Sequence, residues 1–270
     1  MSGSEGRFAR LREALYVVTS CAADLRSRLA LVRCYRSILR STTDPTEEHL
    51  RLRIHGRAFD FHMRRMDVFT VAEILHERQY ELRTGLAPSP IVIDGGANIG
   101  VAALWFLARF PGATVHAFEP EPRNFELLRR NLAGVPGAHA VQAALGANEE
   151  PVLLHLAEHS AVHSVKDAAA GERTVEVPCV RLDRYLAEHG IAHVHLLKLD
   201  VEGSEADAVL GLGQRLADVD VIVGEMHERL VDADALYARL ADAGLHLVQK
   251  QHFRDAEACG VHAFEVARRD

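Results

Sequence analysis

The chain has 270 residues, of which 48% are apolar and 26% are charged, a mixture typical of a globular protein with a sizeable core. The formal net charge of −7 excludes a positive field over the whole protein. It therefore weighs against DNA or RNA as the partner.

Residues 1–48 are predicted to form a helical N-terminal extension. Its apolar residues recur at alternating steps of four and three, a nearly heptad helical pattern, and arginines occupy its other faces. This apolar row consists of Leu11, Leu15, Val18, Ala22, Leu25, Leu29, Val32 and Leu39. Such a row most often packs on the main domain. The alternatives are a homodimer contact or substrate lid and, less favoured, a helix on a membrane surface.

Residues 49–89 are predicted to form a lead-in segment. Alternating apolar residues between 50 and 63 indicate one or two short strands around Gly56. The stretch MDVFTVAEILHERQYEL has helical spacing, and TGLAPSP closes the segment with turn residues.

From residue 90 to residue 270, short apolar strands alternate with helices. This rhythm predicts an α/β domain with a parallel sheet covered on both faces. The strands are expected over IVID, ATVHAFE, AHAVQAAL, HVHLLKLD and DVIVGEMH, with HLVQKQHF and HAFEVARR able to pair as a hairpin. One helix is expected over SEADAVLGLGQRLA. Residues 148–180 depart from the rhythm, and we interpret them as an insertion near the site with a mobile tip.

Cysteine spacing and hydropathy indicate the compartment. The four cysteines are far apart and form no CxxC pair, which predicts reduced thiols rather than a disulfide framework or a zinc site. No apolar run approaches the ~20 residues that a membrane-spanning helix needs. We therefore expect a cytoplasmic protein without a membrane partner.

The turn VIDGGANIG joins the first strand of the sheet to its first helix. Gly95 and Gly96 allow the backbone to approach a ligand closely, and Gly100 lets the helix pack near the strand. A dinucleotide site would have a glycine where Ala97 stands. Asp94 would repel a pyrophosphate, but it suits a ligand with an amino group and no phosphate. S-adenosylmethionine is such a ligand.

The second strand ends in HAFEP, and Glu119 is the predicted partner of the ribose hydroxyls. NAD sites bind the ribose hydroxyls in the same way. Asp94 therefore discriminates between S-adenosylmethionine and NAD, and Glu119 does not. An NAD-linked oxidoreductase is the alternative enzyme. No acid follows the third strand where one would bind adenine; backbone near Ala144 and Leu145, or the side chain of Glu149, is left for that role.

Residues from about 60 to 250 resemble the FkbM family of S-adenosylmethionine-dependent methyltransferases. The resemblance rests on VIDGGANIG, AFEP, AALG, VRLD, VIVGEMH and above all LLKLDVEGSE, whose Lys-Asp-x-Glu-Gly-x-Glu pattern is a family hallmark. It implies a class I methyltransferase fold: Rossmann-like, doubly wound, with a mostly parallel seven-stranded sheet and an antiparallel C-terminal hairpin. It also implies O-methylation of a small-molecule hydroxyl on a secondary metabolite, polyketide or sugar. The first forty residues lie outside the match.

The stretch LLKLDVEGSE places Lys198 and Asp200 on one face of a strand that should end beside the glycine turn. VIVGEMH is the predicted neighbouring strand and brings Glu225 and His227 to the same rim. O-methylation needs a general base near the acceptor oxygen, and His227 is the natural candidate because its ordinary pKa is ~6.5. Asp200 or Glu202 is the alternative base. Lys198 either stabilises a developing alkoxide or merely pairs with the acids to make its burial tolerable.

Two sets of residues are thus predicted for the site. The catalytic set is Lys198, Asp200, Glu202, Glu225 and His227. The cofactor-binding set is Asp94, Gly95, Gly96, Asn98, Gly100, Glu119, Pro120, Ala144 and Asp200. A Mg²⁺ ion held by Asp200, Glu225 and His227 is a less favoured alternative, and Glu205 is expected only to favour the first turn of the next helix. A protein that binds S-adenosylmethionine without turnover is the non-enzymatic alternative.

Overall fold

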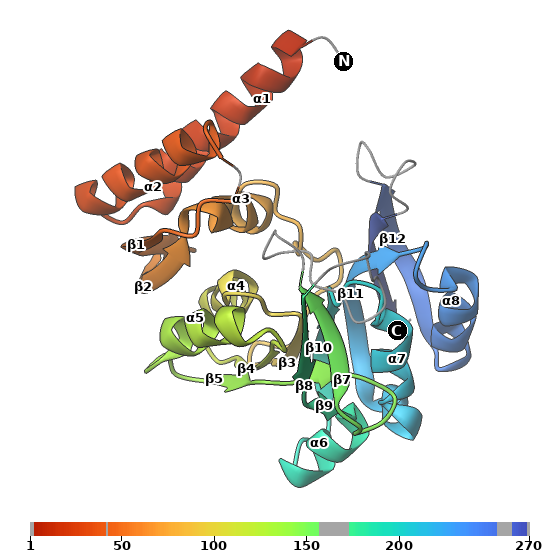
Figure 1. Ribbon diagram of the computed structural model, residues 1–270. Coiled ribbons are helices and arrows are strands. Elements are labelled where there is room, and N and C mark those ends of the chain that lie inside the picture. The colour runs from red at the N-terminus through yellow and green to blue at the C-terminus, as the bar shows by residue number, and fades with distance from the viewer. Residues whose placement is uncertain (1–2, 42, 157–172, 253–260, 269–270) are drawn as a thin grey trace.

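A seven-stranded sheet forms the centre of the computed structural model, which describes residues 3–41, 43–156, 173–252 and 261–268 (Figure 1). The strand order is β12-β13-β11-β10-β3-β4-β5, and β13 pairs antiparallel with both of its neighbours. The other pairings are parallel, which confirms the predicted α/β fold with a C-terminal hairpin. The strands are β3 (Ile91–Gly95), β4 (Thr114–Phe118), β5 (Ala138–Val141), β10 (Val194–Leu199), β11 (Val219–His227), β12 (Leu245–His252) and β13 (Val261–Arg268).

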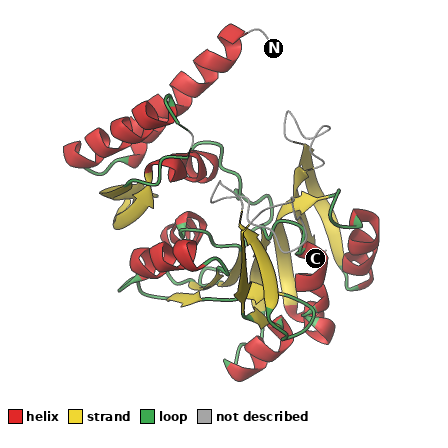
Figure 2. Cartoon of the chain, viewed as in Figure 1, coloured by secondary structure: helices red, strands yellow, loops and turns green. Residues whose placement is uncertain are grey.

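Helices cover both faces of this sheet (Figure 2). One face packs against α4 (Val101–Arg109) and α5 (Pro122–Leu132). The other packs against α6 (Leu182–Glu188), α7 (Glu205–Leu210) and α8 (Ala233–Asp242). Leu196 of β10 belongs to one core and Leu197 to the other, and every position of the strand except His195 is buried, so the strand is mostly apolar.

The predicted helix over SEADAVLGLGQRLA is two elements. α7 ends at Leu210, and a 3-10 helix, η3 (Gly213–Asp218), follows. Gly211 lies so close to the neighbouring chain that a Cβ atom would meet the carbonyl oxygen of Gly146 at 2.2 Å. Gly213 has a φ of +53°, a left-handed conformation that glycine adopts easily. These two glycines interrupt the helix.

The lead-in segment contains the hairpin and the helix that the sequence predicts. β1 (Glu47–Ile54) and β2 (Arg57–Arg64) pair antiparallel around Gly56, whose φ is +79°. A 3-10 turn, η2 (Arg65–Asp67), then leads into α3 (Val68–Leu75). The helix ends at Leu75, earlier than its apolar spacing suggested.

The N-terminal extension is helical and its second helix packs on the main domain, as expected, but most of the apolar row that suggested this packing is exposed. α1 (Gly3–Tyr16) continues into a π-helical turn, η1 (Val17–Cys21), and α2 (Leu25–Ile38) starts afresh after it. This break changes the helical phase, so the row does not form one face. The exposed members are Leu11, Leu15, Leu25, Leu29, Val32 and Leu39.

Apolar residues on another side of α2 provide its packing instead. Ala30, Leu31 and Cys34 are fully buried in the core that also contains β1 and β2. Asp24 caps the helix by accepting a hydrogen bond from the backbone N–H of Ser27 at 2.8 Å. In Figure 1, α1 extends away from the rest of the chain. A role for the extension as a homodimer contact or lid stays a prediction.

The predicted insertion contributes strands to two small sheets beside the main one. β7 (Val152–Leu156) pairs antiparallel with β8 (Arg173–Val177). β6 (Ala144–Leu145) pairs in parallel with β9 (Cys179–Val180). The strand expected over AHAVQAAL is therefore two strands in two sheets, β5 and β6. The predicted mobile tip lies outside the described residues.

Cysteine state and helix lengths bear on two further predictions. Cys21, Cys34 and Cys179 are buried free thiols, whereas Cys259 lies outside the described residues. Within the described ranges, no helix combines the length and the apolar composition needed to cross a bilayer.

Histidine 116 on β4 makes the stability of the fold depend on pH. His116 is 6% exposed, its Nδ1 lies 2.9 Å from the hydroxyl of Tyr185, and burial lowers its pKa to about 4. Unfolded histidine titrates near ~6.5, so the neutral ring's contribution is complete above that pH and is lost as the pH falls toward 4. The loss should be about 3 kcal/mol, measured by urea denaturation across this pH range.

A variant separates this contribution from that of the carboxylates, which also titrate in acid. His116→Gln should reduce the pH dependence of the unfolding free energy, because it removes the buried imidazole. Identical pH profiles for the wild-type protein and His116→Gln would contradict the expectation.

Candidate active site

A cavity of about 260 Å³ opens beyond the carboxyl ends of β3, β4 and β10. This is the edge at which parallel α/β sheets bind ligands. The glycine turn and the end of β4 line one part of the cavity, and acids at the ends of β10 and β11 line another. The lead-in segment supplies a further part of the wall: Thr70, Glu73, Ile74, Gln79 and Tyr80.

The glycine turn is pressed against the end of β10. Gly96 has a φ of +74°, and a Cβ atom there would lie 1.8 Å from the carbonyl oxygen of Asp200, so only glycine fits. Gly96 lines the cavity, whereas Gly95 and Gly100 do not. Gly100, with a φ of +94°, instead lets α4 approach the Leu128 side chain of α5. Gly96 is therefore placed for a ligand and Gly100 for packing.

Glu119 follows β4 and lines the cavity while remaining only 5% exposed. Its Oε2 accepts the backbone N–H of Asn98 at 2.8 Å, and its Oε1 accepts that of Glu121 at 2.9 Å. Burial raises the pKa of Glu119 to about 7, although these two hydrogen bonds oppose the shift. The side chain of Asn124 also hydrogen-bonds this carboxylate, and a lone pair remains for a ligand hydroxyl. Pro120 and Ala144 line the same part of the cavity.

Lys198 is 1% exposed, and its ammonium group contacts polar groups of β3 and of the glycine turn. Its Nζ lies 3.0 Å from Oδ1 of Asp94 and donates to the carbonyl oxygens of Gly95 at 3.1 Å and Gly96 at 2.8 Å. Burial alone would lower the pKa of Lys198, but the carboxylates of Asp94 and Asp200 outweigh burial and raise it. Lys198 thereby ties β10 to β3 and the glycine turn.

Asp94 is not where a cofactor could reach it. It is 0% exposed, does not line the cavity, and lies beside Lys198 in the register of β3 and β10. The predicted contact between Asp94 and the amino group of a cofactor is therefore not supported. Its carboxylate instead balances the buried charge of Lys198.

Asp200, in contrast, lines the cavity directly after β10, and its side chain is 25% exposed. Its Oδ2 accepts a hydrogen bond from the hydroxyl of Tyr80 at 2.8 Å and lies 3.8 Å from Nζ of Lys198. One carboxylate oxygen is thus held by the protein, and the carboxylate remains accessible from the cavity.

His227 does not line the cavity, and its ring lies between two carboxylates. Its Nδ1 lies 2.8 Å from Oε1 of Glu205, and its Nε2 lies 3.0 Å from Oε2 of Glu202. Burial would lower the pKa of His227, but the hydrogen bonds to Glu202 and Glu205 outweigh burial and raise it to about 11. An imidazolium that donates from both nitrogens has no lone pair for a proton. The geometry therefore argues against His227 as the general base, and it gives Glu205 a role that the sequence did not suggest.

Two further acids line the cavity as predicted. Glu225, at the end of β11, contacts the side-chain amide of Gln79. Burial, followed by repulsion from Asp200, raises its pKa well above the ordinary value. Glu202 has a φ of +49°, and burial also raises its pKa, against the opposing contact with His227. Both acids can hold a proton more readily than an exposed glutamate.

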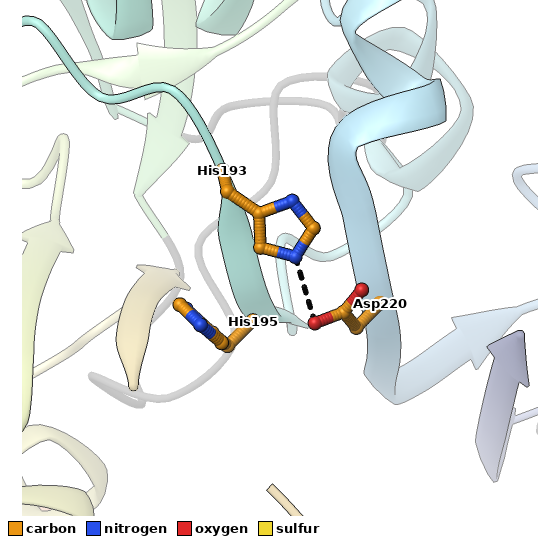
Figure 3. Close-up of side chains that lie close together, drawn as sticks. All are labelled: His193, His195 and Asp220. Atoms are coloured by element: carbon orange, nitrogen blue, oxygen red, sulfur yellow. Dashed lines mark hydrogen bonds and ion pairs between the residues drawn. The ribbon is translucent and has the colours of Figure 1, made fainter. Parts of the chain in front are cut away.

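The residues of the alternative Mg²⁺ site do not form a ligand group. Among the described residues, only His193, His195 and Asp220 bring three ligand atoms within 4.8 Å of one another (Figure 3). The set Asp200, Glu225 and His227 does not, and both ring nitrogens of His227 already contact carboxylates. That part of the prediction is not supported.

The group in Figure 3 lies near the amino-terminal ends of β10 and β11, at the sheet edge opposite the cavity. Nε2 of His193 is 2.8 Å from Oδ2 of Asp220. Nδ1 of His195 accepts the backbone N–H of Ile91 at 3.0 Å, which occupies the single lone-pair nitrogen of a neutral imidazole. These hydrogen bonds account for the group, so we assign no metal to it.

Gln79 and Tyr80 are among the wall residues that sequence reasoning missed. The helical spacing of MDVFTVAEILHERQYEL predicts them within a helix, but α3 ends at Leu75, and Arg78 has a φ of +56°. The chain turns there and places the next two side chains against the acids of β10 and β11. The weak signal in the sequence is the polar stretch HERQYE after the apolar run.

Comparisons with known proteins identify the family. Residues 94–249 match the family model described as Methyltransferase FkbM domain. The 31-O-demethyl-FK506 methyltransferase FkbM of Streptomyces tacrolimicus is 32% identical over 240 residues, which cover 74% of this chain and 89% of that protein. The 2-O-methyltransferase NoeI of Sinorhizobium fredii is 24% identical over 158 residues, covering 53% of this chain and 65% of that protein.

A crystal structure of a methyltransferase FkbM from Methylobacillus flagellatus KT aligns with 96% of this chain and 60% of its own, at 14% identity and a TM-score of 0.48. A likeness at that score adds nothing to the assignment. The family match covers more than half of the chain, and the Streptomyces relative is similar over most of its length. This chain therefore belongs to the FkbM family of methyltransferases.

Proposed function

We propose that this chain is an O-methyltransferase that uses S-adenosylmethionine to methylate a hydroxyl of a small molecule. The observation that carries the proposal is a single cavity with the Glu119 carboxylate at one end and the Asp200 carboxylate at another. The names of two relatives, a 31-O-demethyl-FK506 methyltransferase and a 2-O-methyltransferase, favour oxygen as the methylated atom.

The cofactor part of the cavity has donors and acceptors that suit a nucleoside. Glu119 can accept a ribose hydroxyl without giving up its backbone hydrogen bonds. Oδ1 of Asn98 is buried and has no hydrogen-bond partner among the described residues. Gly96 leaves room where any side chain would collide with β10. S-adenosylmethionine, when bound, supplies a methyl group on a positively charged sulfur.

Asp200 is the proposed general base. The hydroxyl of Tyr80 holds Oδ2, which leaves Oδ1 to take the proton of the acceptor hydroxyl. Glu225 is proposed to hold a proton and donate a hydrogen bond to the acceptor, because burial raises its pKa. Lys198 fixes the end of β10 against the glycine turn, and accurate alignment of the reacting groups can contribute ~7–11 kcal/mol.

Binding of the cofactor tests the proposal directly. Calorimetric titration with S-adenosylmethionine and S-adenosylhomocysteine should give micromolar affinity, with and without Mg²⁺, and NAD should not bind. Glu119→Ala should weaken S-adenosylhomocysteine binding about 10–100-fold, because hydrogen bonds to a charged group are worth ~1.5–3 kcal/mol. Wild-type affinity should also fall as the pH drops below 7, where Glu119 takes up a proton.

Glu126→Ala is the matched control. Glu126 lies on α5, just beyond Glu119, but its side chain is 52% exposed and pairs only with Arg129 in the described structure. That variant should bind like the wild-type protein. Equal affinity of Glu119→Ala and Glu126→Ala would contradict the ribose assignment. Binding without S-adenosylhomocysteine release, across a panel of sugar and polyketide hydroxyls, would favour a non-catalytic protein.

A further inference from the structure

Glu265 is a buried acid that lies outside the cavity, in the last strand of the sheet. It is 3% exposed on β13. Its Oε2 accepts the backbone N–H of Arg83 and its Oε1 accepts that of Thr84, each at 2.8 Å. A buried carboxylate is costly unless its oxygens accept hydrogen bonds. The conformation of residues 83 and 84 is therefore coupled to the burial of Glu265.

The segment fixed in this way carries two residues of the cavity wall. Tyr80 is 2% exposed and donates its hydroxyl to Oδ2 of Asp200 at 2.8 Å. The side-chain amide of Gln79 contacts the carboxylate of Glu225. Nζ of Lys198 lies 5.2 Å from the centre of the Tyr80 ring, within the range of a cation–π contact. Residues 79–84 thus run from the proposed base to β13.

Strand register explains why one acid can hold this segment. Asp94, Lys198, Val223 and Glu265 are successive cross-strand neighbours on β3, β10, β11 and β13. Directly paired residues share a face of the sheet, so Glu265 continues the row of buried charges that begins at Asp94. The lead-in segment lies on this face, and its backbone N–H groups at Arg83 and Thr84 donate to Glu265.

We infer that Glu265 is a positioning residue: by holding residues 83 and 84, it keeps Tyr80 on Asp200 and Gln79 on Glu225, and so fixes the acceptor wall. This rests on the proposed function. Neither Glu265 nor residues 79–84 fall within the matched range 94–249. The wall that would select the acceptor is therefore built and anchored by parts of the chain outside the family match.

The test follows the Tyr80 side chain in the full-length protein saturated with S-adenosylhomocysteine. Tyrosines are replaced by 3-fluorotyrosine, and the ¹⁹F signal of Tyr80 is assigned by its loss in Tyr80→Phe. Glu265→Ala should move that signal toward the position of an exposed fluorotyrosine and raise amide hydrogen exchange in residues 79–84 about tenfold or more. Affinity for S-adenosylhomocysteine should stay within about twofold.

Two variants complete the comparison. Glu265→Gln keeps one oxygen acceptor and should show a smaller displacement; it decides the question if Glu265→Ala does not fold. Glu81→Gln removes an acid of the same segment that is 57% exposed and pairs with Arg78, and it should change nothing. With an acceptor that the wild-type protein methylates, Glu265→Ala should lower kcat/KM for the acceptor about 10–100-fold at an unchanged KM for S-adenosylmethionine.

The outcomes separate the two proposals. An unmoved Tyr80 signal in a Glu265 variant that still binds S-adenosylhomocysteine would overturn this inference alone. A wild-type protein that does not bind S-adenosylhomocysteine would overturn the proposed function, and the positioning role with it.

Discussion

Replacing Lys198 with methionine should lower the free energy of unfolding by about 3–5 kcal/mol, which is the usual cost of leaving one partner of a buried ion pair without the other. Lys198 is 1% exposed and Asp94 is 0% exposed, so water cannot replace the lost ammonium. The carbonyl oxygens of Gly95 and Gly96 would lose their donor as well. Urea denaturation at neutral pH would measure the loss.

A double variant shows whether the uncompensated charge is the cause. Asp94→Asn combined with Lys198→Met should recover part of the stability, because removing both charges is far less costly than removing one. Lys250→Met is the control, since its pair with Glu228 is partly exposed and should be worth less than ~1 kcal/mol. A loss for Lys198→Met as small as that for Lys250→Met would mean that the buried pair does not support the fold.

The sequence was informative where a feature depends on residues that are close together in the chain. Buried parallel strands read as apolar runs, so the main sheet and its hairpin could be predicted. Lys198 and Asp200 stood out because charges rarely interrupt such a run. Glu119 was found because it directly follows a strand end at the glycine-turn edge, and it does line the cavity.

The pairing register of the strands, by contrast, decides which charged side chains meet, and it cannot be read from the sequence. Asp94 was expected to face a cofactor, but the pairing of β3 with β10 places it beside Lys198. His227 looked like a base because histidine titrates near neutrality, yet Glu202 and Glu205 surround it and raise its pKa to about 11. Glu205 comes from the start of α7, so only the folded chain brings these groups together.

The remaining omissions come from backbone turns. A turn at Arg78 directs Gln79 and Tyr80 to strand ends more than a hundred residues away in the sequence. A π-helical turn after Tyr16 likewise breaks an apolar row that looked continuous. Helical spacing is a statement about one regular helix, and it fails wherever the helix stops.

Asp200→Asn should lower kcat for methyl transfer by about 10²–10⁴, the usual contribution of a positioned general base. Asparagine has the same shape and can still accept the hydroxyl of Tyr80, but its amide cannot take a proton from the acceptor. Affinity for S-adenosylhomocysteine should stay within about twofold, which would locate the defect in the chemical step. The measurement is S-adenosylhomocysteine release with an acceptor that the wild-type protein methylates.

Three comparison variants test whether the loss of activity is specific to the Asp200 carboxylate. Asp218→Asn alters an acid that pairs with Arg215 before β11, at the amino-terminal side of the strand, and should keep full activity. Tyr80→Phe keeps the carboxylate but loses one hydrogen bond, so its activity should fall only about tenfold. His227→Gln should reduce stability more than turnover, because its ring is tied to two carboxylates. The reverse pattern, with His227→Gln inactive and Asp200→Asn active, would return the general base to His227.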